Sequence, residues 1–423
     1  MKHQFQEFRE IIQTKPHFRR LWIAHIISLL GDWFSYIAVS LIAIERGEGA
    51  FAIALVLIAH TLPTALTSPI SGPLADRYDR RLILICSYTG AAALTFLMWG
   101  VSGREVWLIQ VVLFLRVGLS GLGMTARSSA IPQLVGSEHL QAANALLGLT
   151  WSVAFTGGLA LGGIVASLLS PAGAILIDAL TFIVATIVYA GLPALPPSGN
   201  KSTKAPASRP KVRDMLEAWR FIRDKPRVLA TVFAKSPSMM ANAGGWLVLN
   251  LVAAQRLKSM DPGMALGLMH ACRAIGSGVG PLLPDHLFPR HPMAGAAAAF
   301  VGVITFGLFQ SPWLFFAGLF IWGAGAGHNW VMSSAEIQRV TPNHVLGRVT
   351  ALDFLLMSSS QVIAVLLAAV MIDMTDAPQS GIWVSVGIGL CVWLLLIALY
   401  SRSPTIPTAN QTQAEESRKP DKT

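Results

Sequence analysis

Charged side chains are scarce in this chain of 423 residues. Only 13% of its residues are Asp, Glu, Lys or Arg, whereas 53% are hydrophobic. Soluble globular domains carry about 25% charged residues. So low a share over this length excludes an ordinary water-exposed surface and indicates an integral membrane protein.

Cysteine and the usual catalytic motifs are also scarce. The three cysteines, Cys86, Cys272 and Cys391, all lie in apolar runs, which argues against a disulfide framework or a zinc site. The sequence shows no paired His or Cys ligand spacing, no nucleophile elbow and no GxxxxGK loop. These gaps argue against an enzyme, an ATP-driven pump or a metal site, and no cofactor is expected. A sensor is also disfavoured, because the longest connection, 194–227, is too short for a folded domain.

Long apolar segments account for most of the chain. A helix needs about 20 apolar residues to cross the roughly 30 Å hydrocarbon core. We therefore expect an all-α integral membrane protein. Its twelve predicted membrane helices are 20–44, 52–73, 81–101, 106–127, 141–169, 173–193, 228–254, 263–284, 293–310, 313–335, 347–371 and 380–401.

The positions of the basic residues predict the topology. With the N-terminus in the cytoplasm, 25 of the 32 Lys and Arg fall on the cytoplasmic side, four outside and three within segments. This asymmetry follows the positive-inside rule. The net charge of +10 therefore reflects topology rather than a nucleic-acid partner, and both termini are expected in the cytoplasm.

A weak internal repeat divides the chain in two. Gly72-Pro73-Leu74 with Asp76 is echoed by Gly280-Pro281-Leu282 with Asp285, an offset of 208 residues in the tripeptide. Parallel repeats of this kind are typical of transporters that bind their substrate between two halves. The predicted parts are a first six-helix half (1–193), a linker with an amphipathic helix (194–227), a second half (228–401) and a disordered tail (402–423).

The loop GPLADRYDRR, residues 72–81, packs five charges between two apolar segments. Gly72 would permit a close backbone approach, and Asp76 would accept hydrogen bonds from a helix N-terminus. Arg77, Arg80 and Arg81 would hold the loop in the cytoplasm. We predict a conformational latch in which the echoed Asp285 also takes part; the alternative is a simple topology anchor.

Ionisable side chains within membrane segments are costly and are candidates for function. At about 1.5 Å per residue, Asp32 and Arg116 both fall near the membrane midplane. We predict that Asp32 is the proton-binding site with Arg116 as its partner; a fixed structural ion pair is the alternative. By contrast, Asp178 is predicted near the outer surface, in a solvated or packing role.

The second half contains further candidates. Lys235 and Asp353 agree in predicted depth to within a helical turn, and we interpret them as a structural ion pair. Arg273 lies near the predicted midplane and is a candidate for binding an anionic substrate group. The tryptophans predicted deep enough to line a substrate cavity, with packing as the alternative, are Trp33, Trp151, Trp246 and Trp330.

Several of these motifs resemble the major facilitator superfamily. Gly72, Asp76, Arg77, Arg80 and Arg81 match its loop signature between helices 2 and 3, and Arg116 matches the arginine of its helix-4 signature. TGGLALGG (156–163) resembles the helix-5 antiporter signature, although Gly158 replaces the usual proline and weakens the implied antiport.

Other segments are similar to the drug:proton antiporter branch that contains macrolide efflux proteins and the enterobactin exporter. They include IPQLVGSEHLQAANALLG, IDALTFIVA and IQRVTPNHVLGRVTAL. The resemblance implies proton-driven export of an amphiphilic small molecule, a drug or a siderophore, from a monomer in a bacterial cytoplasmic membrane. An uptake symporter and a channel are the alternatives.

Overall fold

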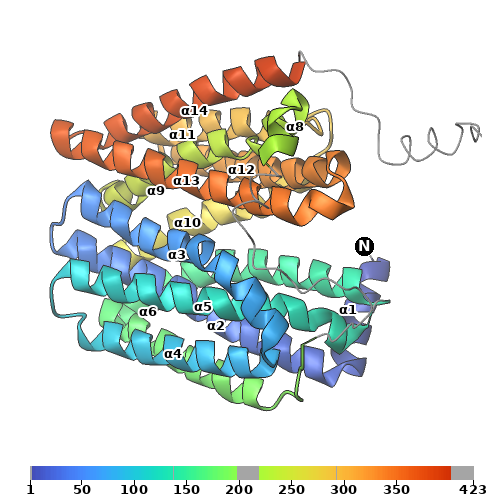
Figure 1. The fold of residues 1–423 in the computed structure, drawn as a ribbon. Coiled ribbons are helices and arrows are strands. Elements are labelled where there is room, and N and C mark those ends of the chain that lie inside the picture. The colour runs from blue at the N-terminus through green and yellow to red at the C-terminus, as the bar shows by residue number, and fades with distance from the viewer. Residues whose placement is uncertain (1, 137, 198–218, 292, 402–423) are drawn as a thin grey trace, which may run out of the picture. The chain divides into compact units, whose positions relative to one another are not determined.

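The computed structural model describes residues 2–136, 138–197, 219–291 and 293–401. The secondary structure of these residues is helical (Figure 1). Most of the predicted linker and the whole predicted tail lie outside the described residues, as does most of the predicted amphipathic helix. Contacts divide the chain into two compact units, the first of residues 1–209 with 249–274 and the second of residues 210–248 with 275–423.

The first unit contains the helices α1 to α6. After the short α1 (Lys2–Thr14) come α2 (Pro16–Glu45), α3 (Ala50–Arg77), α4 (Arg80–Gly100), α5 (Val106–Val135) and α6 (Leu140–Ala190). Proline at the first position of α2 suits a helix start, because its missing N–H has no intrahelical partner there. In Figure 1, α2 and α6 lie side by side, and the two helices pack closely along their lengths.

The 51-residue α6 is a hairpin of two helices. Ser170 has φ 71 and Pro171 follows it, so the helical backbone is interrupted at this point. A Cβ on Gly31 would meet Asp178 and Thr181, whereas a Cβ on Gly158 would meet the Trp33 side chain next along α2. In one straight helix, residues 158 and 178 would be about 30 Å apart. The chain therefore folds back at Ser170, which fits the predicted pair of segments 141–169 and 173–193.

The second unit contains the remaining helices, apart from the residues of α9 and α10 that belong to the first unit. These are α8 (Pro226–Val232), α9 (Ser236–Arg256), α10 (Pro262–Val279), α11 (Ala294–Leu308), α12 (Pro312–Val340), α13 (Asn343–Thr375) and α14 (Pro378–Ser401), with a short 3-10 turn at Gly280–Leu282. Seven described helices, α6 among them, are long and apolar enough to span a membrane. The count of twelve stays a prediction, and the helices fit it.

The predicted seventh segment, 228–254, differs from expectation. It is broken at residues 233–235 into α8 and α9. Asn329 on α12 donates its side-chain N–H to the freed carbonyl of Ala234 at 3.0 Å and accepts from Ser238 at 2.5 Å. A break within a membrane segment is tolerated where neighbouring side chains satisfy the backbone in this way.

Small residues bring α11 and α12 into close contact. A Cβ on Gly302 would lie 2.1 Å from the backbone nitrogen of Trp322, and one on Gly318 would lie 2.5 Å from that of Phe306. Helices in a membrane associate through van der Waals packing of this kind, because lipid gives them no hydrophobic drive to associate.

We expect Gly302→Ala to lower the thermal unfolding midpoint in detergent, because its methyl group would force two backbones apart. Scanning fluorimetry of the purified protein measures the midpoint. The matched control is Gly387→Ala in α14, where an added Cβ would meet no atom within 4 Å. That control should be neutral or stabilising, since alanine favours a helix over glycine by about 0.5–1 kcal/mol. Equal midpoints for the two variants would contradict the packing argument.

Candidate functional site

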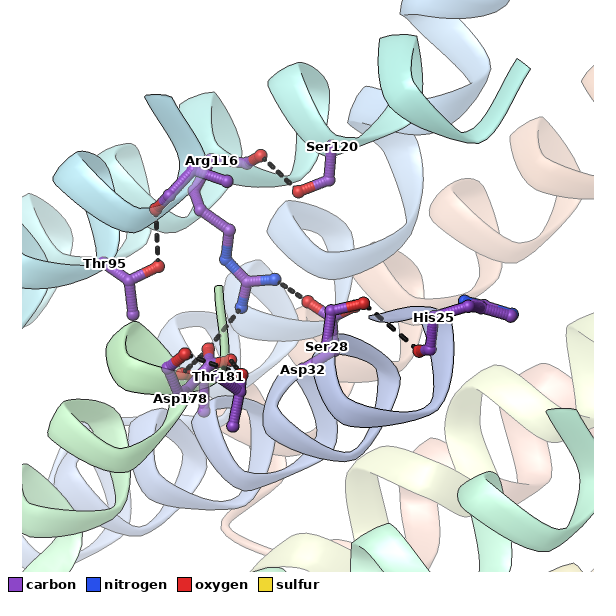
Figure 2. A network of polar contacts seen from close by, with 10 residues as sticks. His25, Ser28, Asp32, Thr95, Arg116, Ser120, Asp178 and Thr181 are labelled. Atoms are coloured by element: carbon purple, nitrogen blue, oxygen red, sulfur yellow. Dashed lines mark hydrogen bonds and ion pairs between the residues drawn. The ribbon is translucent and has the colours of Figure 1, made fainter. Parts of the chain in front are cut away.

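Arg116 on α5 is the centre of a buried ionic cluster in the first unit. Its side chain is 1% exposed. One guanidinium nitrogen donates to Asp32 on α2, and the other lies 3.5 Å from Oδ2 of Asp178 on α6. Figure 2 shows the arginine reaching between the two carboxylates. The Phe182 ring lies against the guanidinium, with its centroid 5.4 Å from Cζ. Three helices are thus joined by one side chain.

Asp178 is placed differently from the sequence-based expectation. It was predicted near the outer surface, but its side chain is fully buried. The hydroxyl group of Ser35 also donates to this carboxylate. The Thr181 hydroxyl donates to the backbone carbonyl of Asp178 at 2.7 Å and lies 3.3 Å from the carboxylate oxygen Oδ1. The spacing could not show that this face of α6 points toward α2. The glycine at position 31 permits the approach, because a Cβ there would lie 2.3 Å from Asp178 Oδ1.

The cluster has more acidic groups than basic ones. Asp32 and Asp178 share one guanidinium, so the ionised cluster carries a net charge of −1. Buried charge without compensation is costly in the membrane interior. One proton removes the surplus charge, and a cationic group bound beside the cluster would do the same.

Solvent exposure distinguishes the two carboxylates. The Asp32 side chain is 25% exposed, whereas that of Asp178 is 0% exposed. Of the two carboxylates, Asp32 is the one with accessible surface. The structure brings the predicted pair Asp32 and Arg116 into contact, and their role in proton coupling stays a prediction.

Further polar residues surround the cluster. His60 on α3 stacks near Trp33, with ring centroids 5.1 Å apart, and it lies close enough to Arg116 for an electrostatic interaction. Toward the end of α5, Arg127 contacts Nδ1 of His25 at 2.7 Å. Arg127 is the last residue of the predicted segment 106–127, and α5 continues beyond it to Val135.

Two of the predicted cavity residues belong to an aromatic cluster of the first unit. Trp33 packs edge-on against Phe155 with centroids 4.8 Å apart, and Trp151 stacks on the same ring at 5.1 Å. Arg273, which is buried, lies over that ring, with Cζ 5.2 Å from the centroid. Trp33 is buried and Trp151 is exposed, and their contact with a substrate stays a prediction.

The other two tryptophans and the predicted ion pair lie in the second unit. Trp246 is buried and Trp330 is exposed. Lys235, at the break between α8 and α9, bonds Asp353 on α13 at 2.5 Å, and its ammonium lies 5.1 Å from the Trp330 ring centroid. The structure thus brings the two charges together, both almost fully buried.

The charged loop at residues 72–81 is organised by an aspartate that the prediction overlooked. Asp79 caps α4 by accepting from the backbone N–H of Arg81 at 2.8 Å and also accepts from that of Leu195 at 3.0 Å. Asp76, the expected acceptor, is exposed within the last turn of α3. The prediction of Asp76 as the acceptor was wrong because α3 extends to Arg77. The next helix therefore begins one turn beyond Asp76.

The other residues of the predicted latch vary in their contacts. Arg81 donates to the carbonyl of Ala190 at 2.6 Å, and Arg80 is buried, whereas Arg77 is exposed. Gly72 does not make the close approach expected of it, because an added Cβ would meet no atom within 4 Å. Asp285 pairs with Arg290 at 2.8 Å. A conformational role for these residues stays a prediction.

No metal centre emerges among the residues described, since no group of three or more His, Cys, Asp or Glu side chains is placed to hold an ion. The three cysteines are free thiols. The contacts found at the site are ion pairs and hydrogen bonds.

We expect Asp79→Ala to destabilise the protein by about 0.5–2 kcal/mol, the usual cost of losing a helix N-cap. The loop contact with Leu195 is lost as well. Chemical or thermal unfolding in detergent measures the change. Asp76→Ala, three residues earlier on an exposed position, serves as control and should leave stability unchanged. If Asp76→Ala lowered stability more than Asp79→Ala, Asp76 would be the capping residue instead.

We expect Lys235→Met to destabilise the second unit by about 3–5 kcal/mol, because it leaves the Asp353 carboxylate buried without its cation. The double variant Lys235→Met/Asp353→Leu should recover most of this loss, since neither charge remains. Thermal unfolding of both proteins measures the difference. If the double variant were as unstable as the single one, the ion pair would contribute to stability in some way other than by charge neutralisation.

The comparisons with known proteins cover nearly the whole chain. The model of the transmembrane secretion effector family of major facilitator transporters matches residues 12–420. The enterobactin exporter EntS of Citrobacter koseri is 26% identical over 419 residues, which are 94% of this chain and 96% of that protein. The MFS-type transporter YfiS of Bacillus subtilis is 28% identical over 224 residues, a match that spans about half of each chain (51% and 52%).

Solved transporters share the fold. The nucleoside transporter NupG superposes with a TM-score of 0.71 at 11% identity, covering 92% of this chain and 100% of that one. A bacterial homologue of the iron transporter ferroportin gives 0.64 at 18% identity, covering 92% and 99%. At these identities the likeness concerns the fold alone. Together with the family match, it shows that this chain belongs to the transmembrane secretion effector family of the major facilitator superfamily and is a multi-pass membrane transporter.

Proposed function

We propose that this transporter exports an amphiphilic small molecule across a bacterial cytoplasmic membrane by proton antiport. The observation that carries the proposal is the Arg116 guanidinium shared by two carboxylates, one of them partly exposed. Such a cluster holds one proton more easily than an isolated ion pair would. Proton entry at Asp32 would then alternate with outward movement of the substrate.

The relatives support export and suggest the substrate class. Proteins named enterobactin exporter match this chain over nearly its full length at 26% and 24% identity. A siderophore or similar secreted metabolite is therefore the first substrate class of the proposal. A cationic amphiphilic drug, such as a macrolide, is the second candidate, because the surplus negative charge of the cluster favours a positively charged group.

The transport cycle follows from this charge balance. In the proposed inward-open state, Asp32 releases its proton to the cytoplasm and the substrate binds. In the outward-open state the substrate leaves, and a proton from outside returns to Asp32. Each cycle thus moves substrate outward while protons move inward down their gradient. Cytoplasmic termini and a monomer that acts alone belong to the same proposal.

Everted membrane vesicles provide the test. An imposed gradient, acid inside, is followed with a pH-sensitive dye while iron-free siderophores, macrolides and cationic dyes are added in turn. We expect one class to trigger proton release in the wild type. Asp32→Asn should reduce that release to the level of vesicles lacking the protein, because the amide keeps the shape of the side chain but cannot titrate.

The matched control is Asp376→Asn, the same chemical change at an exposed residue in the left-handed cap of α13. Asparagine tolerates that backbone conformation, so this variant should release protons like the wild type. Proton release that persists in Asp32→Asn would move the coupling to another residue. A folded wild type that responds to no compound would instead favour uptake, and currents above carrier turnover would favour a channel.

A further inference from the structure

We propose that Asp178 is the fixed anion of the coupling site and the alternate partner of Arg116. When Asp32 takes up a proton, the guanidinium moves its hydrogen bonds from Asp32 to Asp178; when Asp32 releases the proton, the guanidinium returns. Asp178 is thus a positioning residue that keeps the arginine in place through the cycle. The inference rests on the proposed proton coupling and adds the residue that makes the exchange reversible.

Polar groups around Asp178 offset part of the cost of burying its charge. Its carboxylate lies wholly away from solvent and accepts a hydrogen bond from Ser35 on α2. The Thr181 hydroxyl and the guanidinium lie 3.3 and 3.5 Å from its two oxygens. A carboxylate that accepts hydrogen bonds is stabilised in its charged form. Donors from several helices thus surround it, and it has no exposed edge through which a proton arrives directly.

Asp32 has the opposite surroundings. Among the described residues its one hydrogen-bond donor is Arg116, and a quarter of its side chain is exposed. Protonation therefore breaks one charge-assisted contact at an accessible group. Protonation of Asp178 would instead disturb the Ser35 hydrogen bond and the approach of the guanidinium at a sealed group. The proton thus belongs on Asp32, while Asp178 keeps the negative charge.

The guanidinium is positioned for the exchange. One of its nitrogens bonds Asp32, and the other lies 3.5 Å from Asp178, beyond the usual 2.7–3.2 Å of an N–H···O hydrogen bond. A displacement of less than an ångström would bring it into full contact with Asp178. Gly31 keeps the two helices close enough for this, because any side chain there would occupy the space between Asp178 and Thr181.

The charge balance explains why two carboxylates are needed. With both ionised, the cluster carries −1; with a proton on Asp32, the remaining Arg116 and Asp178 pair is neutral. A cluster of Arg116 and Asp32 alone would leave an unpaired buried cation on protonation. A cation without a partner is costly in a low-dielectric interior. The second carboxylate removes that barrier to proton uptake.

Other titratable groups face the cluster and have to be kept constant. His60 comes from α3, His25 from α2 and Arg127 from α5, and the last interacts electrostatically with Asp32. The variants below leave all three unchanged, so a shift between them reports the Asp32, Arg116 and Asp178 cluster.

Infrared spectroscopy of the purified protein tests the exchange without any substrate. A difference spectrum against pH detects the carbonyl stretch of a protonated carboxylic acid. We expect the wild type to show such a band and Asp32→Asn to lose it. Asp178→Asn should keep the band with its midpoint about one to three pH units lower, the usual effect of a neighbouring charge, because Arg116 would then serve Asp32 alone.

A second variant keeps the test valid if Asp178→Asn fails to fold. Ser35→Ala removes one donor from Asp178 and leaves every charge in place, so Asp178 competes more strongly for the arginine. The midpoint should then move to higher pH, opposite to Asp178→Asn. The control is Ser40→Ala on the same helix, whose hydroxyl is buried and has no hydrogen-bond partner in the described part of the chain. This variant should match the wild type.

Three results would overturn the inference. A band that disappears in Asp178→Asn but persists in Asp32→Asn would make Asp178 the proton carrier. Midpoints unmoved by both Asp178→Asn and Ser35→Ala would reduce Asp178 to a packing role, while a band lost in Asp32→Asn would still support the proposed function. A wild type without a titrating band would reject proton coupling at the cluster altogether.

Discussion

The pairing of Arg116 with two carboxylates is the interaction on which the arrangement of the first unit depends. Hydrocarbon offers no water to a charged group, so each charge must find its partner inside the protein. The guanidinium joins α2, α5 and α6 at one level. The glycines at positions 31 and 158 permit the close approach of α2 to both arms of α6. The close packing of these helices and the ionic cluster are therefore aspects of the same constraint.

The second unit meets the same constraint with different residues. Lys235 lies where the membrane segment breaks, and Asp353 neutralises it. The break also frees backbone groups, and Asn329 satisfies one of them. This cluster has one cation and one anion, so it has no surplus charge. The first unit therefore has one carboxylate more than its guanidinium can neutralise, whereas the ion pair of the second unit is complete.

The sequence was most informative where a single physical rule decides the outcome. Segment length and the cost of buried charge predicted the membrane helices and the common depth of Asp32 and Arg116. Depth along a helix, however, does not tell which neighbour a side chain faces, and so the contact of Asp178 with Arg116 was not predicted. The capping aspartate was misassigned because spacing alone does not reveal that α3 continues to Arg77 and that α4 begins at Arg80.

The surplus negative charge also constrains how substrate and proton can be coupled. A substrate with a cationic group can neutralise the cluster itself, so it competes with the proton directly at Asp32. A substrate without a cationic group cannot neutralise the cluster. Such a substrate would have to be coupled to the proton through a conformational change that makes Asp32 accessible from the other side of the membrane. Under the proposed function, the same cluster would serve both substrate classes. The charge of the substrate would then decide whether substrate and proton compete directly at Asp32 or are coupled by a movement of helices.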